Sequence, residues 1–138
     1  MEQVFADTFY WIALTNSRDN WHERVLEFTA TLDRVEIITT DEILTEVLNF
    51  LCTYGPSMRR RTVQLVQDIL EDQNIQVIEQ THLSFNQGLT LYEQRLDKAY
   101  SLTDCISMQI MKNMGINSIL THDKHFTQEG FGILFQDK

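Results

Sequence analysis

The chain has 138 residues, of which 43% are hydrophobic, so we predict one domain over residues 1–138 with an ample core. Its apolar runs are too short to cross a membrane, and its first residues lack the basic start and apolar run of a signal peptide, which predicts a cytoplasmic location. The formal net charge of −9 lowers the expectation of nucleic-acid binding without excluding it, because phosphate affinity comes largely from Lys and Arg.

Strand and helix signals alternate along the chain. Short apolar runs predict strands at residues 3–6, 35–39, 74–79, 116–121 and 131–135. Longer periodic segments predict helices at residues 9–14, 19–32, 39–51, 57–71, 81–96 and 101–114. Pairs of helices between strands leave room for parallel crossover connections. The pattern therefore predicts an α/β fold with a mostly parallel central sheet.

The helix of residues 39–51 carries two glutamates that helical geometry separates. At roughly 100° per residue, its apolar stripe leaves Glu42 on the opposite, solvated face, where it is best explained as a capping partner for Thr39. Glu46 borders the stripe and is positioned to face across the top of the sheet. Earlier in the chain, Asp7 lies at the junction between the first strand and the first helix.

Two further aspartates lie at the ends of a helix-plus-strand unit. Ser101 followed by Asp104 forms an N-terminal capping pattern, and the helix after it is apolar on nearly every side, which indicates burial. Gly115 is a natural stop for this helix. The strand that follows delivers Asp123 at its carboxyl end, and ligands bind at that edge of an open α/β sheet.

Each of these four carboxylates has an ordinary structural explanation when it is taken alone. Asp7 could be an N-cap, Asp104 could serve the helix dipole, Glu46 could be solvated, and Asp123 could be a turn aspartate. Together on one rim they would repel each other and raise their own pKa values unless cations neutralised them. Hard oxygen ligands favour Mg²⁺ or Mn²⁺, and such ions support the hydrolysis of phosphodiesters.

Over nearly its full length, the sequence resembles the PIN-domain nucleases, in particular the VapC-type toxins of bacterial toxin-antitoxin pairs. The order and spacing of short motifs carry the resemblance. The matching pieces are Val4-Phe5-Ala6-Asp7-Thr8 with Ile12-Ala13-Leu14, then His22, Thr45-Glu46-Val47-Leu48, Tyr100-Ser101-Leu102-Thr103-Asp104, and Leu120-Thr121-His122-Asp123-Lys124-His125-Phe126.

The resemblance implies a three-layer α/β/α fold, related to the Rossmann fold, and a metal-dependent endoribonuclease that uses Mg²⁺ or Mn²⁺. It also implies an RNA substrate, a homodimer, and an antitoxin protein whose tail occupies the cleft. The implied catalytic and metal-binding residues are Asp7, Glu46, Asp104 and Asp123. The implied supporting residues, which would donate or accept hydrogen bonds, are Thr8, Ser101 and Thr121.

The remaining candidates are weaker. His122 and His125 flank Asp123, where they could bind a softer metal or carry protons, but the family pattern varies at both positions, so we interpret them as surface histidines. Cys52 and Cys105 lie on apolar helical stretches without metal-ligand spacing, which favours buried reduced thiols. The basic cluster at residues 59–61 fits either a solvated helix face or an RNA contact.

Two other functions are compatible with parts of the pattern. A PIN-like fold that has lost catalysis would act as an RNA-binding or protein-binding module, which the intact carboxylates disfavour. A magnesium phosphohydrolase acting on small phosphate esters would usually carry two aspartates spaced by one residue after the first strand. The run Asp7-Thr8-Phe9 does not supply the second aspartate.

Overall fold

Five parallel strands form the centre of the computed structural model, which describes residues 2–137. The strands are β1 (Glu2–Ala6), β2 (Val35–Thr40), β3 (Ile75–Ile78), β4 (Ser118–Leu120) and β5 (Gly132–Ile133). They are ordered β3-β2-β1-β4-β5, and every neighbouring pair is parallel. The predicted α/β fold is therefore confirmed, with a sheet that is entirely parallel in the described residues.

Seven helices connect these strands within residues 2–137. They are α1 (Thr8–Thr15), α2 (His22–Thr31), α3 (Asp41–Phe50), α4 (Pro56–Glu71), α5 (His82–Gln94), α6 (Leu102–Met114) and α7 (His125–Gln128). None of them is both long and apolar enough to cross a lipid bilayer.

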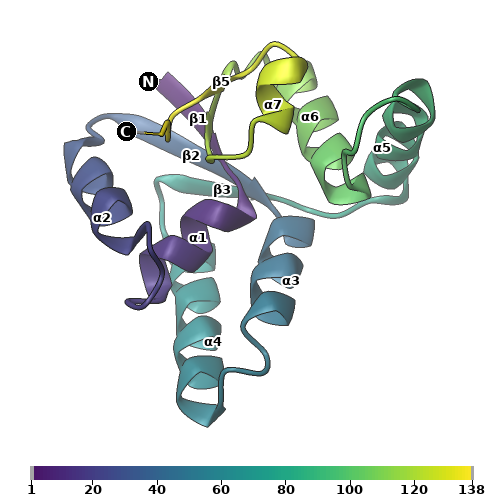
Figure 1. Ribbon diagram of the computed structural model, residues 1–138. Coiled ribbons are helices and arrows are strands. Elements are labelled where there is room, and N and C mark those ends of the chain that lie inside the picture. Colours follow the sequence, from purple (N-terminus) through teal and green to yellow (C-terminus); the bar gives the residue numbers. More distant parts are fainter. Residues whose placement is uncertain (1, 138) are drawn as a thin grey trace.

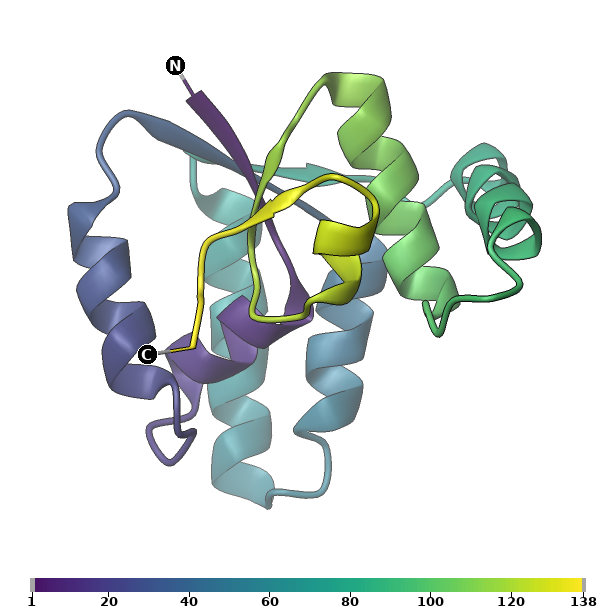
Figure 2. The same cartoon turned by 45° about the horizontal axis from the view of Figure 1, so that its top comes forward.

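The strand order places the helices in two layers. The chain moves from β1 to β3 in one direction and then returns past β1 to β4 and β5. Because parallel crossovers are right-handed, α1 to α4 cover one face of the sheet and α5 to α7 lie on the other, an arrangement visible in Figures 1 and 2. Within the second layer, α5 packs on α6 (Figure 1).

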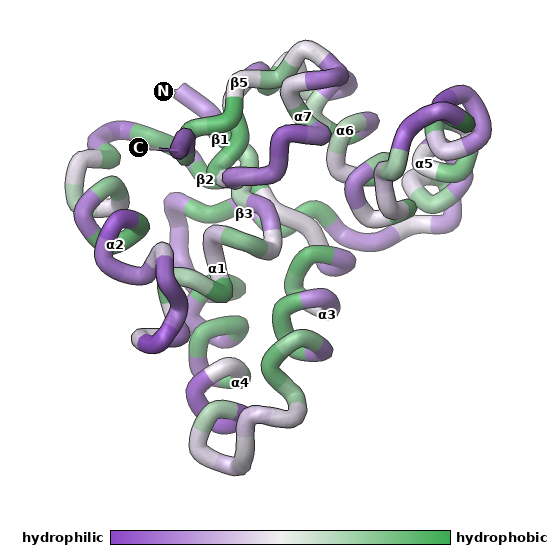
Figure 3. Tube along the Cα trace, viewed as in Figure 1, coloured by the Kyte–Doolittle hydropathy of each residue, from purple (hydrophilic) through white to green (hydrophobic). Residues whose placement is uncertain are grey.

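The core lies along the central strands. In β1, residues Val4, Phe5 and Ala6 are buried, and Phe5 pairs with Ile38 of β2 on one side and Ile119 of β4 on the other. Figure 3 shows hydrophobic colouring along β1 and on α1 and α3, whereas the loop between β4 and α7 is hydrophilic. The polar residues of that loop therefore lie directly beside the buried carboxyl end of the sheet.

The cap predicted for the third helix is wrong. Thr39 is fully buried at the end of β2 and donates a 3.0 Å hydrogen bond to the Ala6 carbonyl. The N-cap is Thr40, whose hydroxyl accepts a hydrogen bond from the Ile43 amide. One Glu42 carboxylate oxygen is buried without a hydrogen-bond partner in residues 2–137, and this burial raises the pKa of Glu42. The expectation of a solvated Glu42 was based on periodicity alone and missed the elements packed around the helix start.

Three smaller expectations also need correction. The second helix begins at His22 rather than Asp19, because the Asp19 side chain accepts the Trp21 amide in a turn that precedes the helix. Cys52 follows α3 and is exposed, whereas Cys105 is buried as expected. The short helix α7 falls in a segment for which no helix was predicted.

Candidate metal centre

The candidate site lies where the strand order reverses. β1 and β4 are neighbours, with Phe5 paired to Ile119 and Ala6 to Leu120, so their carboxyl ends lie side by side. The crossovers that follow β1 and β4 run over opposite faces of the sheet, and ligands of open α/β sheets bind beside the carboxyl ends of two such strands. Asp7 follows β1 directly, and the segment from Thr121 to Asp123 follows β4.

Asp7 is the most buried acid of the site, with 6% of its surface exposed. Its backbone is the N-cap of α1, yet its side chain makes no capping hydrogen bond, so the N-cap explanation does not account for the carboxylate. The Thr121 hydroxyl donates a 2.8 Å hydrogen bond to Asp7 Oδ2. Burial, with added repulsion from Asp104, raises the pKa of Asp7 to about 7. A negative charge on Asp7 is therefore disfavoured by burial and by the neighbouring charge of Asp104.

Glu46 reaches the same place from the second turn of α3. The Thr8 hydroxyl donates a short hydrogen bond to Glu46 Oε1, which joins residues 38 positions apart. Glu46 also contributes to raising the pKa values of both Asp7 and Asp104 through its charge. The sequence-based distinction between Glu46 and Glu42 is thus supported at Glu46, although Glu42 is less solvated than expected.

Asp104 interacts through its charge with each of the other three acids. It occupies the first turn of α6, where Ser101 and Asp104 form the predicted capping box: Ser101 N–H donates to Asp104 Oδ2, and Asp104 N–H donates to the Ser101 hydroxyl. Burial raises its pKa, and the charges of Asp123 and Glu46 add to that effect. A carboxylate that serves only as a cap would not experience this repulsion.

Asp123 is held by the loop that follows β4. Its amide donates a 3.1 Å hydrogen bond to the Thr121 hydroxyl, the same hydroxyl that donates to Asp7. Asp123 Oδ1 accepts the His125 amide at 2.9 Å, in an Asx turn that leads into α7. Thr121 therefore links Asp7 and Asp123 through a single fully buried side chain.

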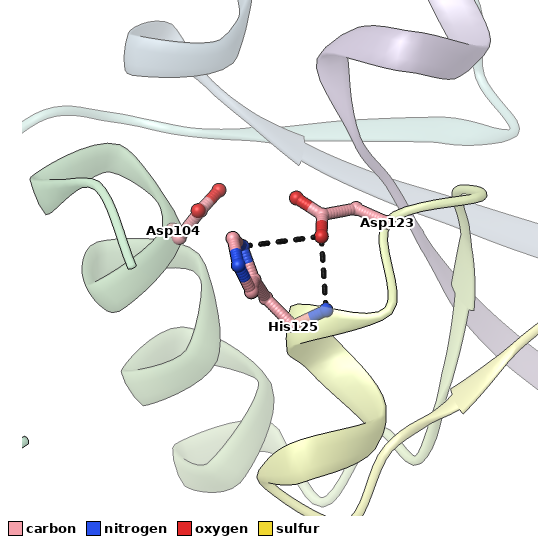
Figure 4. A group of neighbouring side chains, drawn as sticks. All are labelled: Asp104, Asp123 and His125. Carbon is pink, nitrogen blue, oxygen red and sulfur yellow. Dashed lines mark hydrogen bonds and ion pairs between the residues drawn. The ribbon is translucent and has the colours of Figure 1, made fainter. Parts of the chain in front are cut away.

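The two histidines beside Asp123 differ in their surroundings. His122 Nδ1 lies 3.0 Å from the Phe135 carbonyl oxygen, and its ring packs on Trp21 with 4.4 Å between ring centroids. His125 faces the acids: one donor atom from each of Asp104, Asp123 and His125 lies within 4.8 Å of the others (Figure 4). The side chains of His122 and His125 are 28% and 34% exposed, so both reach the surface, while His125 also contacts the acids. The sequence signal that could have identified His125 is the Asx turn, which brings its ring back over Asp123.

The donor set fits a hard divalent cation. Glu46, Asp104 and Asp123 each use one oxygen in the hydrogen bonds described above and retain a second. No Lys or Arg within residues 2–137 forms an ion pair with any of the four acids. Buried carboxylates without a protein counter-charge are strongly destabilised unless protons or metal ions neutralise them. Oxygen donors of this kind are those that Mg²⁺ and Mn²⁺ prefer.

The structure brings an oxygen of Asp104 within 4.8 Å of one of Asp123, and Asp7 and Glu46 lie near enough for their charges to raise or share in the raised pKa values of the site. Thr8, Ser101 and Thr121 form hydrogen bonds with these acids. These acids come from the ends of β1 and β4 and from α3 and α6, which are distant in sequence. Their local positions explain the geometry: strands β1 and β4 end at one edge, and α6 begins at that same edge.

Comparison with known proteins gives a consistent picture. A PIN domain family model matches residues 4–131. The curated 23S rRNA-specific endonuclease VapC20 of Mycobacterium tuberculosis is 27% identical over 136 residues, which cover 93% of this chain and 95% of VapC20. The resemblance to PIN-domain nucleases inferred from the sequence is therefore confirmed.

Two solved structures share the fold. The crystal structure of Mycobacterium tuberculosis VapC20, described as a Sarcin-Ricin loop cleaving toxin, has a TM-score of 0.82 at 23% identity and covers 93% of this chain and 95% of its own. VapBC2 from Rickettsia felis, bound to a promoter DNA fragment, has a TM-score of 0.64 at 12% identity and covers 97% of this chain and 98% of the matched chain.

Proposed function

The chain belongs to the PIN domain family, and on that premise we propose that it is a metal-dependent endoribonuclease that acts as the toxin of a toxin-antitoxin pair. The observation that carries the proposal is that four carboxylates, without a Lys or Arg partner in residues 2–137, lie near the adjacent carboxyl ends of β1 and β4. The similarity to a curated RNA endonuclease over 93% of the chain supports the same activity.

The proposed metal ligands are Asp7, Glu46, Asp104 and Asp123, and the proposed ion is Mg²⁺ or Mn²⁺. When bound, such an ion lowers the pKa of a water molecule and stabilises negative charge on a phosphodiester under in-line attack. Burial raises the pKa of Asp7 because it disfavours the charged form of the carboxyl. A bound cation would favour the charged form and lower this pKa.

The three hydroxyl residues keep the acids in place. Thr8 holds Glu46 and Thr121 holds Asp7, so each carboxylate has one oxygen oriented by the protein. Ser101 fixes Asp104 at the start of α6 through the capping box. Hydrogen-bonded partners of this kind orient metal ligands and increase metal affinity.

RNA is the substrate that the comparisons favour. VapC20 is named a 23S rRNA-specific endonuclease, and we propose that this chain also cleaves RNA. The net charge of −9 fits a narrow target better than indiscriminate cleavage, because few cations are available for contacts with phosphates. The proposal includes a cytoplasmic location, where ribosomal RNA is found.

Two protein partners complete the proposal. The first is a cognate antitoxin, supported by the fold shared with VapBC2, a complex that binds its own promoter DNA. The second is another copy of this chain. Phe85, Leu89, Tyr92 and Leu96 form a helical stripe on α5 and the turn after it, and 37 to 85% of the surface of each is exposed. We define these four residues as the α5 stripe and propose that it is the dimer interface.

The direct test is cleavage of ribosomes and of total cellular RNA by purified protein with Mg²⁺ or Mn²⁺. The proposal expects discrete cleavage products that disappear with EDTA and with Asp7→Asn. Asp33→Asn is the matched control, because it removes one exposed carboxylate just before β2, at the end of the sheet opposite the acids. This variant should cleave like the original protein.

A folded protein that binds divalent metal but cuts neither ribosomes nor RNA, in the absence of antitoxin, would overturn the nuclease proposal. RNA retention in a binding assay under those conditions would then support the inactive binding module. Cleavage that persists in Asp7→Asn would show that the activity belongs to a contaminating nuclease.

A further inference from the structure

A nitrogen donor lies at the Asp104–Asp123 end of the carboxylate cluster. His125 contributes an imidazole nitrogen that lies, together with one oxygen from each aspartate, within a span of 4.8 Å. Figure 4 shows the carboxylates of Asp104 and Asp123 directed toward each other, with the imidazole of His125 beside the space between them. The three residues come from α6, the loop after β4 and the start of α7.

The imidazole is held in this place by its neighbours. The His125 amide donates to Asp123 Oδ1, so the backbone of His125 is anchored on the same carboxylate that its ring approaches. The ring of Tyr100 packs edge-on against the imidazole, with 5.6 Å between centroids and 63° between planes. A ring oriented by a backbone hydrogen bond and an aromatic contact needs little rearrangement to act as a ligand.

The nitrogen of His125 that faces the acids forms no aligned hydrogen bond in the described residues. This nitrogen, Nδ1, is buried and lies 3.2 Å from Asp123 Oδ1. His122 provides the contrast, because its Nδ1 is paired with the Phe135 carbonyl and its Nε2 lies 3.1 Å from Asp137. The contact with Asp123 is an ion pair only when the ring is protonated, so a neutral imidazole leaves this buried nitrogen able to bind a cation.

We propose that Asp104, Asp123 and His125 form a mixed oxygen-nitrogen metal position in which His125 Nδ1 binds the ion directly and selects Mn²⁺ over Mg²⁺. The inference deepens the proposed function, since it rests on the same acids holding a divalent cation. Mg²⁺ takes oxygen ligands almost exclusively, whereas first-row transition metals accept imidazole nitrogen. The Asp7–Glu46 side of the cluster, with oxygen donors alone, carries no such preference.

The test is electron spin-echo envelope modulation of Mn²⁺ added to the purified protein, a measurement that detects a nitrogen bonded to the ion without any RNA. The original protein should show ¹⁴N coupling to Mn²⁺. His125→Ala should lose the coupling and lower Mn²⁺ affinity by at least about tenfold, as metal-site substitutions typically do, while Mg²⁺ affinity stays within about threefold. His125→Asn is a second variant of closer size, and circular dichroism checks that both are folded.

His122→Ala is the matched control, because it removes a histidine on the other side of Asp123 that contacts Phe135 rather than the acids. It should keep the ¹⁴N coupling. Mn²⁺ bound to the original protein without nitrogen coupling would overturn the inference, as would coupling that survives in folded His125→Ala and His125→Asn or disappears in His122→Ala. Failure of the folded original protein to bind Mn²⁺ would also overturn it.

These outcomes are separable from those of the nuclease proposal. RNA cleavage without nitrogen coupling would leave the nuclease standing and reject the role of His125. Nitrogen coupling in a protein that cuts no RNA would support the role of His125 and reject the nuclease.

Discussion

The Thr121 hydroxyl donates a 2.8 Å hydrogen bond to Asp7 Oδ2, linking the ends of β4 and β1 across 114 residues of sequence. The same hydroxyl accepts the Asp123 amide at 3.1 Å. One buried side chain thus sets the relative position of two acids of the candidate metal centre.

Removing this hydroxyl should weaken the site without unfolding the protein. Thr121→Val keeps the shape of the side chain and leaves Asp7 without its side-chain hydrogen bond, which should raise the pKa of Asp7 further. Loss of a partner that orients a ligand typically costs about 10- to 100-fold in metal affinity or activity. Calorimetric titration with Mn²⁺ measures the effect. Thr62→Val in α4 is the control, because within residues 2–137 that buried hydroxyl donates only to the Met58 carbonyl. This variant should leave Mn²⁺ affinity unchanged.

The stability of the metal-free protein should fall as pH rises. The pKa of Asp7 is about 7 in the folded protein against 3.8 for an unperturbed side chain, so the folded state holds an extra proton between these values. Stability from this group is therefore full below about pH 4 and is lost as pH rises through 7. Asp7→Asn removes the effect, and its stabilisation should be about 2 to 3 kcal/mol larger at pH 8 than at pH 5. Urea denaturation in EDTA at both pH values tests this, and an Asp7→Asn effect independent of pH would contradict it.

Divalent metal should stabilise the fold, and more so at higher pH. Mn²⁺ at about 100 times its dissociation constant should add about 2.7 kcal/mol to the free energy of unfolding. The gain should shrink from pH 8 to pH 5.5, because Asp7 and Asp104, whose pKa values are raised, must lose protons to bind the ion. Thermal denaturation with and without Mn²⁺ at the two pH values measures the difference. An equal gain at both pH values would show that the ion binds elsewhere.

Substitution of Gly88 should disturb the contact between α5 and α6. A Cβ atom at this position would lie 2.4 Å from Ile106 Cγ1, which no relaxed packing allows. Gly88→Ala should therefore reduce stability by about 1 to 3 kcal/mol, despite the better helix propensity of Ala. In an Ile106→Ala background the same substitution should cost less. A double-mutant cycle by urea denaturation isolates the coupling, and additive effects would contradict this packing explanation.

The α5 stripe should control the oligomeric state. Leu89→Glu places a charge in the middle of the stripe, where 45% of the Leu89 surface is exposed in the single chain. Burying that charge at an interface is costly, so the dimer should dissociate while the monomer keeps its fold. Val63→Glu is the matched control on α4, where 48% of Val63 is exposed. Sedimentation equilibrium should report a monomer for Leu89→Glu alone, and a dimer that withstands this change would contradict the proposed interface.

Much of the candidate site could be predicted because its acids follow local rules. The capping pattern of Ser101 and Asp104, the stop at Gly115 and the end of β1 before Asp7 are each encoded within a few residues. Parallel strands all end at one edge, so acids after two such strands are expected at the same edge before their order is known. Helical periodicity places Glu46 beside an apolar stripe, facing across the top of the sheet, and the family resemblance adds the expectation that it binds metal.

Other features could not be predicted, because they depend on which elements become neighbours. Periodicity describes the faces of a single helix, so it assigned Glu42 to solvent and could not show the structure that covers one of its oxygens. Phe9 provides another example: its ring packs against Trp21 and also against Phe135, and no sequence pattern joins Phe9 to Phe135.

The sequence by itself determined the α/β class, the ends of most elements and the four carboxylates, since these depend on hydrophobic period and on capping residues close to each position. Only the tertiary structure decided that β4 lies beside β1, and with it the bond from Thr121 to Asp7 and the approach of His125 to Asp104. The physical reason is that strand order depends on how the helices pack on both faces of the sheet. That packing involves interactions throughout the core, which no short segment of sequence encodes.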